Sequence, residues 1–191
     1  MSSRILALHD ACRKGDLAKV TNLLSRGCDP NGLVPDRNQW SPLHVAAYYG
    51  HEAACNLLLV MGAEVNAVTA RWWTPLMLAC KRNLPGMVGA LVHHGADLDM
   101  VDQFGDSALH MAAEAGADLC VRHLVEAGAY VNIVNHLGQT AKEKVLSGSE
   151  HYSLATQKAI FSLLKSGVSQ MYQQGNAARN IENVDSSTLL I

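Results

Sequence analysis

Short blocks of small and apolar residues alternate with polar segments along most of the chain, and the blocks recur at a fixed spacing. Residues 41–46 read S-P-L-H-V-A, residues 74–79 T-P-L-M-L-A and residues 107–112 S-A-L-H-M-A, so each block begins 33 residues after the last. Each opens with Ser or Thr, which favour the N-cap of a helix, and Pro42 and Pro75 suit the first helical position. The pattern predicts a short helix in each block, and Thr140 continues the spacing.

A second apolar segment follows each block and ends near a glycine. These segments are residues 53–59, 87–92 and 119–125, and Gly62, Gly95 and Gly128 come after them, again 33 residues apart. A glycine there suits the left-handed backbone that closes many helices. Small residues such as Ala46 and Ala112 on the first helices would let neighbours approach closely. Neither helix of a pair can bury its apolar stripe alone, so adjacent pairs must supply the core.

The 33-residue period, the T-P-L-H-x-A-like blocks and the G-A-x-V-N ending of the pairs resemble the ankyrin repeat over residues 4–167. The resemblance implies an all-α solenoid of about five stacked helix-turn-helix units with projecting loops, and a role in protein recognition without catalysis. We expect an N-terminal capping unit at 1–35, inner units at 36–68, 69–101 and 102–134, and a C-terminal capping unit at 135–169 with a longer loop between its helices. Residues 170–191 lose the phase and are expected to form a flexible tail.

Aromatic residues gather in the loops and first helices of units two to four. In ankyrin repeats these parts line a concave groove, so the resemblance implies that a partner protein or peptide binds there. Trp and Tyr are enriched among interface hot spots, and nearby cations favour a partner with an acidic segment. The residues expected to bind are Arg37, Trp40, Tyr48, Tyr49, Arg71, Trp72, Trp73, Lys81, Arg82, Phe104 and Glu114. Alternatively, the rings of Trp40 and Trp73 pack against the next loop and stiffen the stack.

Trp72 stands at the loop position that Gly105 and Gly138 fill in later units, and Gln39 departs from glycine in the same way. Glycine enters the left-handed region at low cost, whereas a bulky side chain does not. Either these two loops contain a different turn, or Trp72 and Gln39 accept backbone strain.

The histidines and cysteines do not form a recognisable chemical site. His9, His44 and His110 occupy the L-H-x-A position, where the family uses the imidazole as a hydrogen bond between neighbouring loops. No zinc, phosphate-binding, dinucleotide or nucleophile motif is present. We therefore expect no catalytic residue, no metal and no cofactor, and hence not an enzyme. Asp97 and Asp99, at the end of a unit, are expected to satisfy loop amides.

Leu58, Glu64, Val65 and Asn66 resemble the pattern that asparaginyl hydroxylases recognise in ankyrin repeats. Asn66 is accordingly a candidate for hydroxylation. The competing interpretation is that its side chain only hydrogen-bonds its own turn.

Composition narrows the class of partner. The chain has 191 residues, 49% of them hydrophobic and 17% charged, with a formal charge of −2, which gives no electrostatic reason to bind nucleic acid. The start lacks a signal-peptide pattern, no apolar run is long enough to span a bilayer, and five cysteines lack a C-x-x-C pair. We expect a cytoplasmic or nuclear protein that does not insert into membranes and is monomeric on its own. The alternative function is a targeting or regulatory subunit of an enzyme complex, with the contact on the tail, which ends in Leu189-Leu190-Ile191, or on the convex face.

Overall fold

The computed structural model describes residues 2–34, 38–147 and 152–167, and within them the chain forms helices joined by loops. The first helices of successive units are α1 Ser2–Lys14, α3 Pro42–Tyr49, α5 Pro75–Lys81, α7 Ala108–Glu114 and α9 Ala141–Ser147. The second helices are α2 Leu17–Ser25, α4 Glu52–Val60, α6 Pro85–His93, α8 Asp118–Glu126 and a helix over residues 154–167. This order is the predicted solenoid of five helix pairs.

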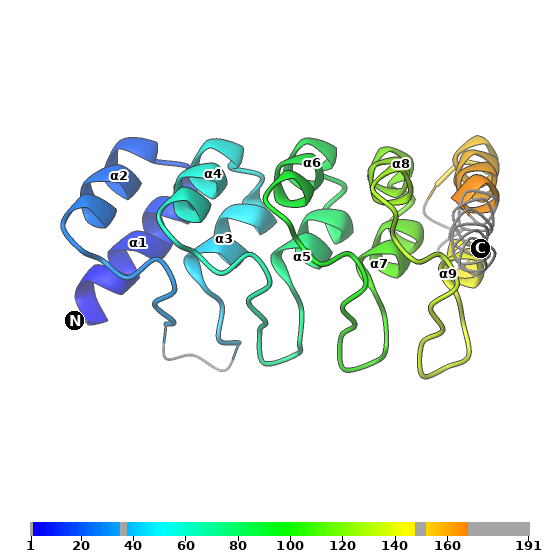
Figure 1. Cartoon of the computed structure of the whole chain (residues 1–191), viewed down its shortest axis with the longest axis horizontal. Coiled ribbons are helices and arrows are strands. Elements are labelled where there is room, and N and C mark those ends of the chain that lie inside the picture. The colour runs from blue at the N-terminus through cyan, green and yellow to red at the C-terminus, as the bar shows by residue number, and fades with distance from the viewer. Residues whose placement is uncertain (1, 35–37, 148–151, 168–191) are drawn as a thin grey trace, which may run out of the picture.

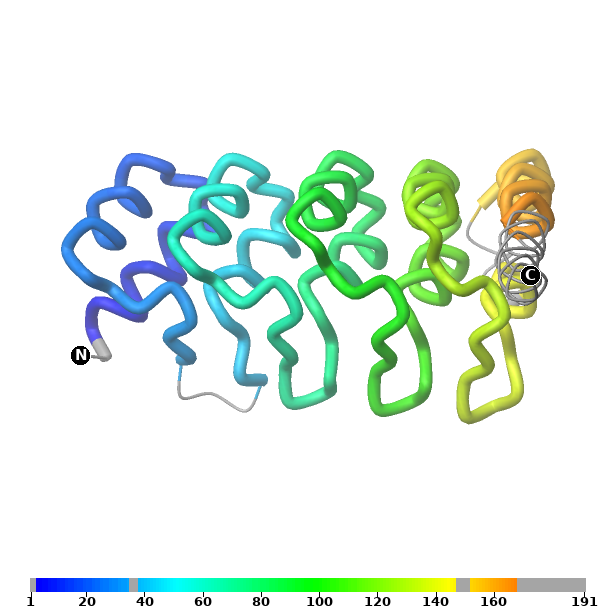
Figure 2. The backbone as a smooth tube through the Cα atoms, viewed as in Figure 1, coloured from blue at the N-terminus to red at the C-terminus, as the bar shows by residue number. Residues whose placement is uncertain are grey.

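The helices form two layers, and the loops project from one of them. Each first helix packs against the first helix of the next unit, from α1 to α9, and the second helices pack in a parallel row. Figure 1 shows the two rows, with the loops between units extending as a series of fingers beyond the first helices. The tube in Figure 2 follows the same course of helix, helix and loop from one unit to the next.

Leucines at repeating positions build the core between units. Leu8, Leu43, Leu76 and Leu109 form a column through the first helices, and Leu58, Leu91 and Leu124 form one through the second helices; each is at most 1% exposed. Burying such a side chain contributes roughly 1.5–3 kcal/mol. Because helices of adjacent units pack against one another, the stability of one unit depends on the next.

Local capping chemistry starts the first helices where the sequence predicts. Ser41 Oγ accepts a hydrogen bond from the backbone N–H of His44 at 3.3 Å, and Thr74 Oγ1 accepts one from Met77 at 3.2 Å. The same helices carry buried small residues, among them Ala46 and Ala112, where adjacent units approach. The second helices extend one or two residues beyond the predicted segments at their ends. The predicted long loop of the last unit and the predicted tail fall largely outside the described residues.

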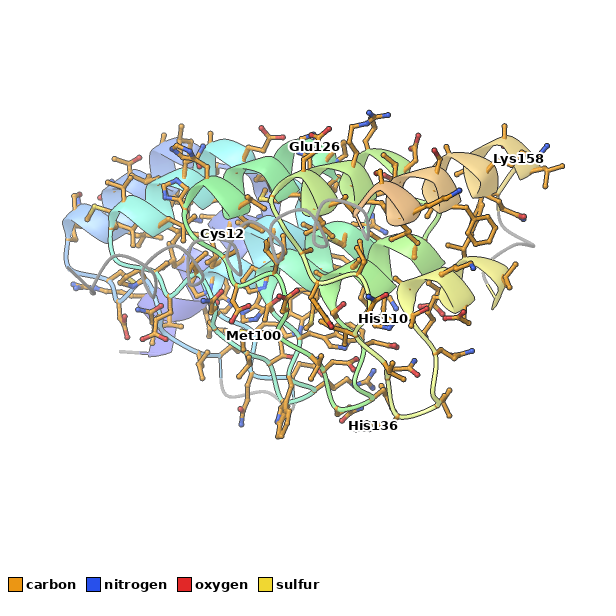
Figure 3. The ribbon with its side chains drawn as sticks, turned by 45° about the vertical axis from the view of Figure 1, so that its right-hand side comes forward. Cys12, Met100, His110, Glu126, His136 and Lys158 are labelled. Atoms are coloured by element: carbon orange, nitrogen blue, oxygen red, sulfur yellow. The ribbon has the colours of Figure 1, made fainter. Side chains whose placement is uncertain are left out.

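Histidines and backbone amides connect each loop to the next. His44 Nε2 lies 3.0 Å from the carbonyl oxygen of Trp73, and His110 Nε2 lies 3.0 Å from that of Gln139. The backbone N–H of His136 also donates to the carbonyl of Phe104 at 2.9 Å. Figure 3 shows His110 where the helices meet the loops and His136 out toward the loop tips. The loops therefore form a bonded row.

Candidate functional site

Trp72 occupies the left-handed region that the sequence left open. Its φ is +62° and that of Gln39 is +52°, while the glycines at the equivalent positions, Gly105 and Gly138, have φ of +78° and +73°. The loops thus keep a positive φ at this position. Trp72 and Gln39 accept the backbone strain, which is roughly 1–2 kcal/mol for a residue with a Cβ. The Trp72 side chain is 61% exposed. A large apolar ring is held out to solvent at a position where glycine would fit without strain.

Trp73, next in the chain, has the opposite environment. Its ring is partly buried against the core, and its indole N–H donates to Asp102 Oδ2 of the following unit at 2.9 Å. Asp102 is only 2% exposed, and its other oxygen accepts the backbone N–H groups of Phe104 and Asp106. The Trp73 side chain therefore ties the loop of unit three to that of unit four.

Cations lie over the aromatic faces rather than beside carboxylates. The Nζ of Lys81 lies 5.0 Å from the Trp73 ring centroid, and the Cζ of Arg71 lies 5.8 Å from it. The Cζ of Arg82 lies 4.8 Å from the ring centroid of Tyr48. Such contacts fix the direction of a flexible cation, and each contributes about 0.5–1 kcal/mol at an exposed site. We call Tyr48, Arg71, Trp73, Lys81 and Arg82 the cation ridge.

The remaining aromatics of unit two form a chain of edge contacts. The ring centroids of Trp40 and Tyr48 are 5.2 Å apart, as are those of Tyr48 and Tyr49, and both pairs are T-shaped. Trp40 is partly buried against the core, whereas Tyr49 is 47% exposed. Aromatic pairs prefer this edge-to-face geometry, and the contacts hold the Tyr49 ring in place at the surface.

Two hollows divide the predicted binding residues. The N-terminal hollow has a volume of about 360 Å³ and is lined by His9, Asp10, Arg13, Val34, Asn38, Trp40, Val45 and Tyr49. The C-terminal hollow has a volume of about 460 Å³ and is lined by Trp73, Lys81, Asp102, Phe104, Asp106, Met111, Glu114, Asn135, His136, Leu137 and Lys144. The sequence predicted one continuous groove. It missed the contribution of units one and five, because only the fold shows which loops border each hollow.

Lys144 joins the C-terminal hollow through a partly enclosed charge network. Its Nζ lies 2.9 Å from Asp106 Oδ2 and 3.8 Å from Glu114 Oε1, and its side chain is 11% exposed. Asp106 also accepts from Asn135 Nδ2 at 2.7 Å. These ion pairs turn the Lys144 side chain toward unit four. It stands 33 residues after Met111, which is the signal that could have placed it.

Two of the predicted site residues are not part of this arrangement as described. Arg37 is outside the described residues. Asn66 is exposed, and its Oδ1 accepts the backbone N–H of Asp97, in the next unit, at 2.9 Å. Asp99, one period after Asn66, likewise accepts the N–H of Tyr130 at 2.8 Å. The interpretation that Asn66 bonds its own turn is thus corrected, because this bond joins two units, and Asp99 satisfies a loop amide as predicted.

The buried histidine and cysteine side chains are part of the packed helix stack. Burial lowers the pKa of His44 to about 4 despite its hydrogen bonds to backbone carbonyls of Trp73 and Ala67. Burial also raises the pKa of the thiols of Cys12 and Cys55 to about 12, so neither is an activated nucleophile at neutral pH. Across residues 2–34, 38–147 and 152–167, no cluster of three or more His, Cys, Asp or Glu side chains has a metal-binding arrangement. In those ranges, no helix has the length and apolar character needed to cross a bilayer.

Comparison with known proteins assigns the family. The family model described as ankyrin repeats (3 copies) matches residues 3–69 and 61–135. The chain is 38% identical over 76 residues to the ARF GTPase-activating protein Git of Drosophila melanogaster, covering 40% of this chain and 10% of that protein. It is 41% identical over 59 residues to the histone-lysine N-methyltransferase EHMT1 of Homo sapiens, covering 31% of this chain and 4% of the relative. It is also 42% identical over 53 residues to protein phosphatase 1 regulatory subunit 12A of Mus musculus, covering 28% of this chain and 5% of the relative.

The chain spans a tenth or less of the length of these relatives. The residues that the family model matches include the three capped blocks at 41–46, 74–79 and 107–112 and the buried leucine columns. With its helix pairs stacked in the same period, this chain belongs to the ankyrin-repeat family.

Proposed function

We propose that the chain is a non-catalytic adaptor that binds a partner protein through the concave side of units two to four. Ankyrin repeats mediate protein–protein interaction, and the relatives include a protein named as a regulatory subunit. The proposed contact surface comprises the cation ridge, Trp72, and the exposed rings of Tyr49 and Phe104. Its mechanism is equilibrium recognition by preformed side chains, which lowers the ordering cost of binding.

The observation that carries the proposal is Trp72. Its ring is 61% exposed and its backbone is left-handed, so the residue adds strain and an apolar surface. Strained positions of this kind persist where the surrounding fold holds them and are concentrated at functional sites. A Trp that removes its area from water on binding recovers that cost in the complex.

The cation ridge supports a partner with an acidic segment. Arg71, Lys81 and Arg82 are exposed and directed by aromatic faces. Guanidinium and ammonium groups held in this way can pair with carboxylates at little further cost in side-chain entropy.

The test is affinity capture from a cell extract with quantitative mass spectrometry. Trp72→Gly should lose partners that the wild-type chain retains, because glycine accepts the turn and only the ring is removed. Val60→Ser is the matched control, since Val60 is 74% exposed at the end of α4, in the second-helix layer. Trp73→Ala is a poor probe, because it would also break the bond to Asp102. Equal partner profiles for Trp72→Gly and the wild type would refute the groove.

A targeting or regulatory role in an enzyme complex is the second proposal, and it is favoured by the regulatory-subunit relative. In this case the contact would lie on the convex face or within residues 170–191, and the enzyme would be a separate chain or domain. Deletion of 170–191 would abolish capture while Trp72→Gly would not. We also propose that the chain is monomeric and acts in the cytoplasm or nucleus, which sedimentation and imaging of a tagged chain would test.

Asn66 is proposed separately as a hydroxylation site. Asn66 is exposed, and together with Leu58, Glu64 and Val65 it forms the pattern that resembles the sites of asparaginyl hydroxylases. Incubation with an asparaginyl hydroxylase should add the mass of one oxygen to the peptide that contains Asn66. The Asn66→Ala chain should gain none, and an unmodified wild-type chain would refute the proposal.

A further inference from the structure

The binding side carries two hollows, and the cation ridge lies between them and borders the C-terminal hollow through Trp73 and Lys81. The N-terminal hollow lies between units one and two and has Trp40, Val45 and Tyr49 among its walls. The C-terminal hollow is centred on unit four and has Phe104 and Met111 among its walls. Volumes of about 360 and 460 Å³ fall in the lower part of the range of ligand pockets, so each open hollow can accept an apolar side chain.

The ridge between the hollows has excess positive charge. In the part of the chain that the structure describes, the ion pairs join Asp10 to Arg13 and Lys14, and Lys144 to Asp106 and Glu114. The ridge cations take no part in these pairs. Arg71 and Lys81 lie over one ring, Trp73, and Arg82 lies over Tyr48 of the preceding unit. Negative charge on an occupant would therefore be attracted to the middle of the surface and not to its ends.

The spacing of the hollows follows from the packing of the first helices. Adjacent first helices are in contact, and packed helices lie roughly 8–10 Å apart. The N-terminal hollow falls between α1 and α3 and the C-terminal hollow over α7, which separates them by about 20–25 Å. An extended chain rises about 3.3 Å per residue, so roughly six to eight residues would bridge them.

We infer that the occupant of this surface is one extended peptide segment with two apolar or aromatic anchors, roughly six to eight residues apart, and acidic residues between them. One anchor enters each hollow, and the acidic residues lie on the cation ridge. The inference rests on the proposed function and specifies the chemistry of its partner. It differs from a general acidic preference, because it fixes where along the partner the charge must lie.

The experiment selects binders from a phage-displayed library of random peptides of about sixteen residues, longer than the predicted span. Selection on the wild-type chain should enrich two apolar positions at the stated spacing with Asp or Glu between them. A synthetic copy of the enriched peptide then serves as the probe in fluorescence polarisation. Its affinity for the chain should fall when either anchor is changed to Ser or the acidic residues are changed to Lys.

Three variants connect each part of the peptide to its site. Tyr49→Ser should weaken the peptide at least about fivefold, and the loss should disappear when the N-terminal-hollow anchor is already Ser. Phe104→Ser should behave in the same way for the other anchor. Lys81→Glu should restore binding to the peptide with Lys at the acidic positions. Tyr49 and Phe104 are 47% and 56% exposed, so circular dichroism should show intact folds, and Val60→Ser should bind as the wild type does.

The outcomes separate this inference from the proposed function. Enriched peptides with one anchor, with another spacing or without acidic residues overturn the inference, yet leave the groove standing if Trp72→Gly still loses the natural partner. Failure to enrich any peptide overturns it too, because the occupant would then be a folded surface. Peptides that bind all three variants equally and depend on residues 170–191 would overturn both proposals.

Discussion

Trp73→Phe should destabilise the stack, whereas Trp72→Phe should not. The two residues are adjacent and chemically identical, but only Trp73 donates its indole N–H to the buried carboxylate of Asp102, at 2.9 Å. Phenylalanine keeps an aromatic ring and removes the donor. A hydrogen bond to a charged group contributes about 1.5–3 kcal/mol, so with Trp73 only partly buried we expect a loss of about 2 kcal/mol. At 61% exposure, Trp72→Phe should stay within about 0.5 kcal/mol of the wild type.

The assay is urea and thermal unfolding followed by far-ultraviolet circular dichroism. For a domain of this size, a loss of about 2 kcal/mol lowers Tm by about 4–8 °C. Because repeat arrays can lose two-state behaviour, unfolding is also followed by intrinsic fluorescence. The two transitions should coincide. A double-mutant cycle with Asp102→Ala should give a coupling energy above about 1 kcal/mol. Equal stabilities for the two Phe variants, or no coupling, would refute the assignment of Trp73 as the connection between units.

Three further predictions concern pH, thiols and the outer loops. Burial lowers the pKa of His44 to about 4. Between about pH 6.5 and pH 4 the unfolded chain therefore binds a proton at this residue, whereas the folded chain does not. The free energy of unfolding should fall by roughly 3 kcal/mol over this range. Urea midpoints across this range test it, and a slope unchanged in His44→Asn would contradict it. Burial raises the pKa of Cys55 to about 12 and of Cys80 well above its usual value, so a thiol reagent should label them only after unfolding; rapid labelling of the native chain would exclude this. Asn66→Ala removes the acceptor for the Asp97 amide and should cost about 0.5–1.5 kcal/mol by urea unfolding, with no change expected if the bond is absent in solution.

The helices could be predicted because their signals are local. Ser41 and Thr74 each satisfy an N–H three residues ahead, and this geometry depends on little beyond the turn itself. The buried leucine columns follow from the same period, since residues 33 apart must occupy equivalent places in a stack. The sequence therefore predicted the starts of the first helices of units two to five.

The site was less predictable, because its contacts cross from one unit to another. The sequence grouped Arg71 and Lys81 with the aromatics, but it could not show that both lie over the Trp73 ring. It left the turn at Trp72 undecided, since local steric preference favours glycine and only the surrounding loop row shows that the turn is kept. It did not single out Lys144, because the ion pair to Asp106 that holds this side chain inward joins two units.

The position before each helix cap shows why aromatic residues alone were a poor guide to the binding surface. Trp73 and Asp106 are equivalent residues one period apart, and so are Asp102 and Asn135. In one interface Trp73 donates to Asp102; in the next, Asn135 donates to Asp106 at 2.7 Å. The same connection is made twice with donor and acceptor exchanged, so the change from Trp to Asp preserves a structural bond. Variation at this position therefore need not reflect a change of partner. Specificity is better sought at side chains that take no part in the connection, such as those of Trp72 and Phe104, which remain exposed beside it.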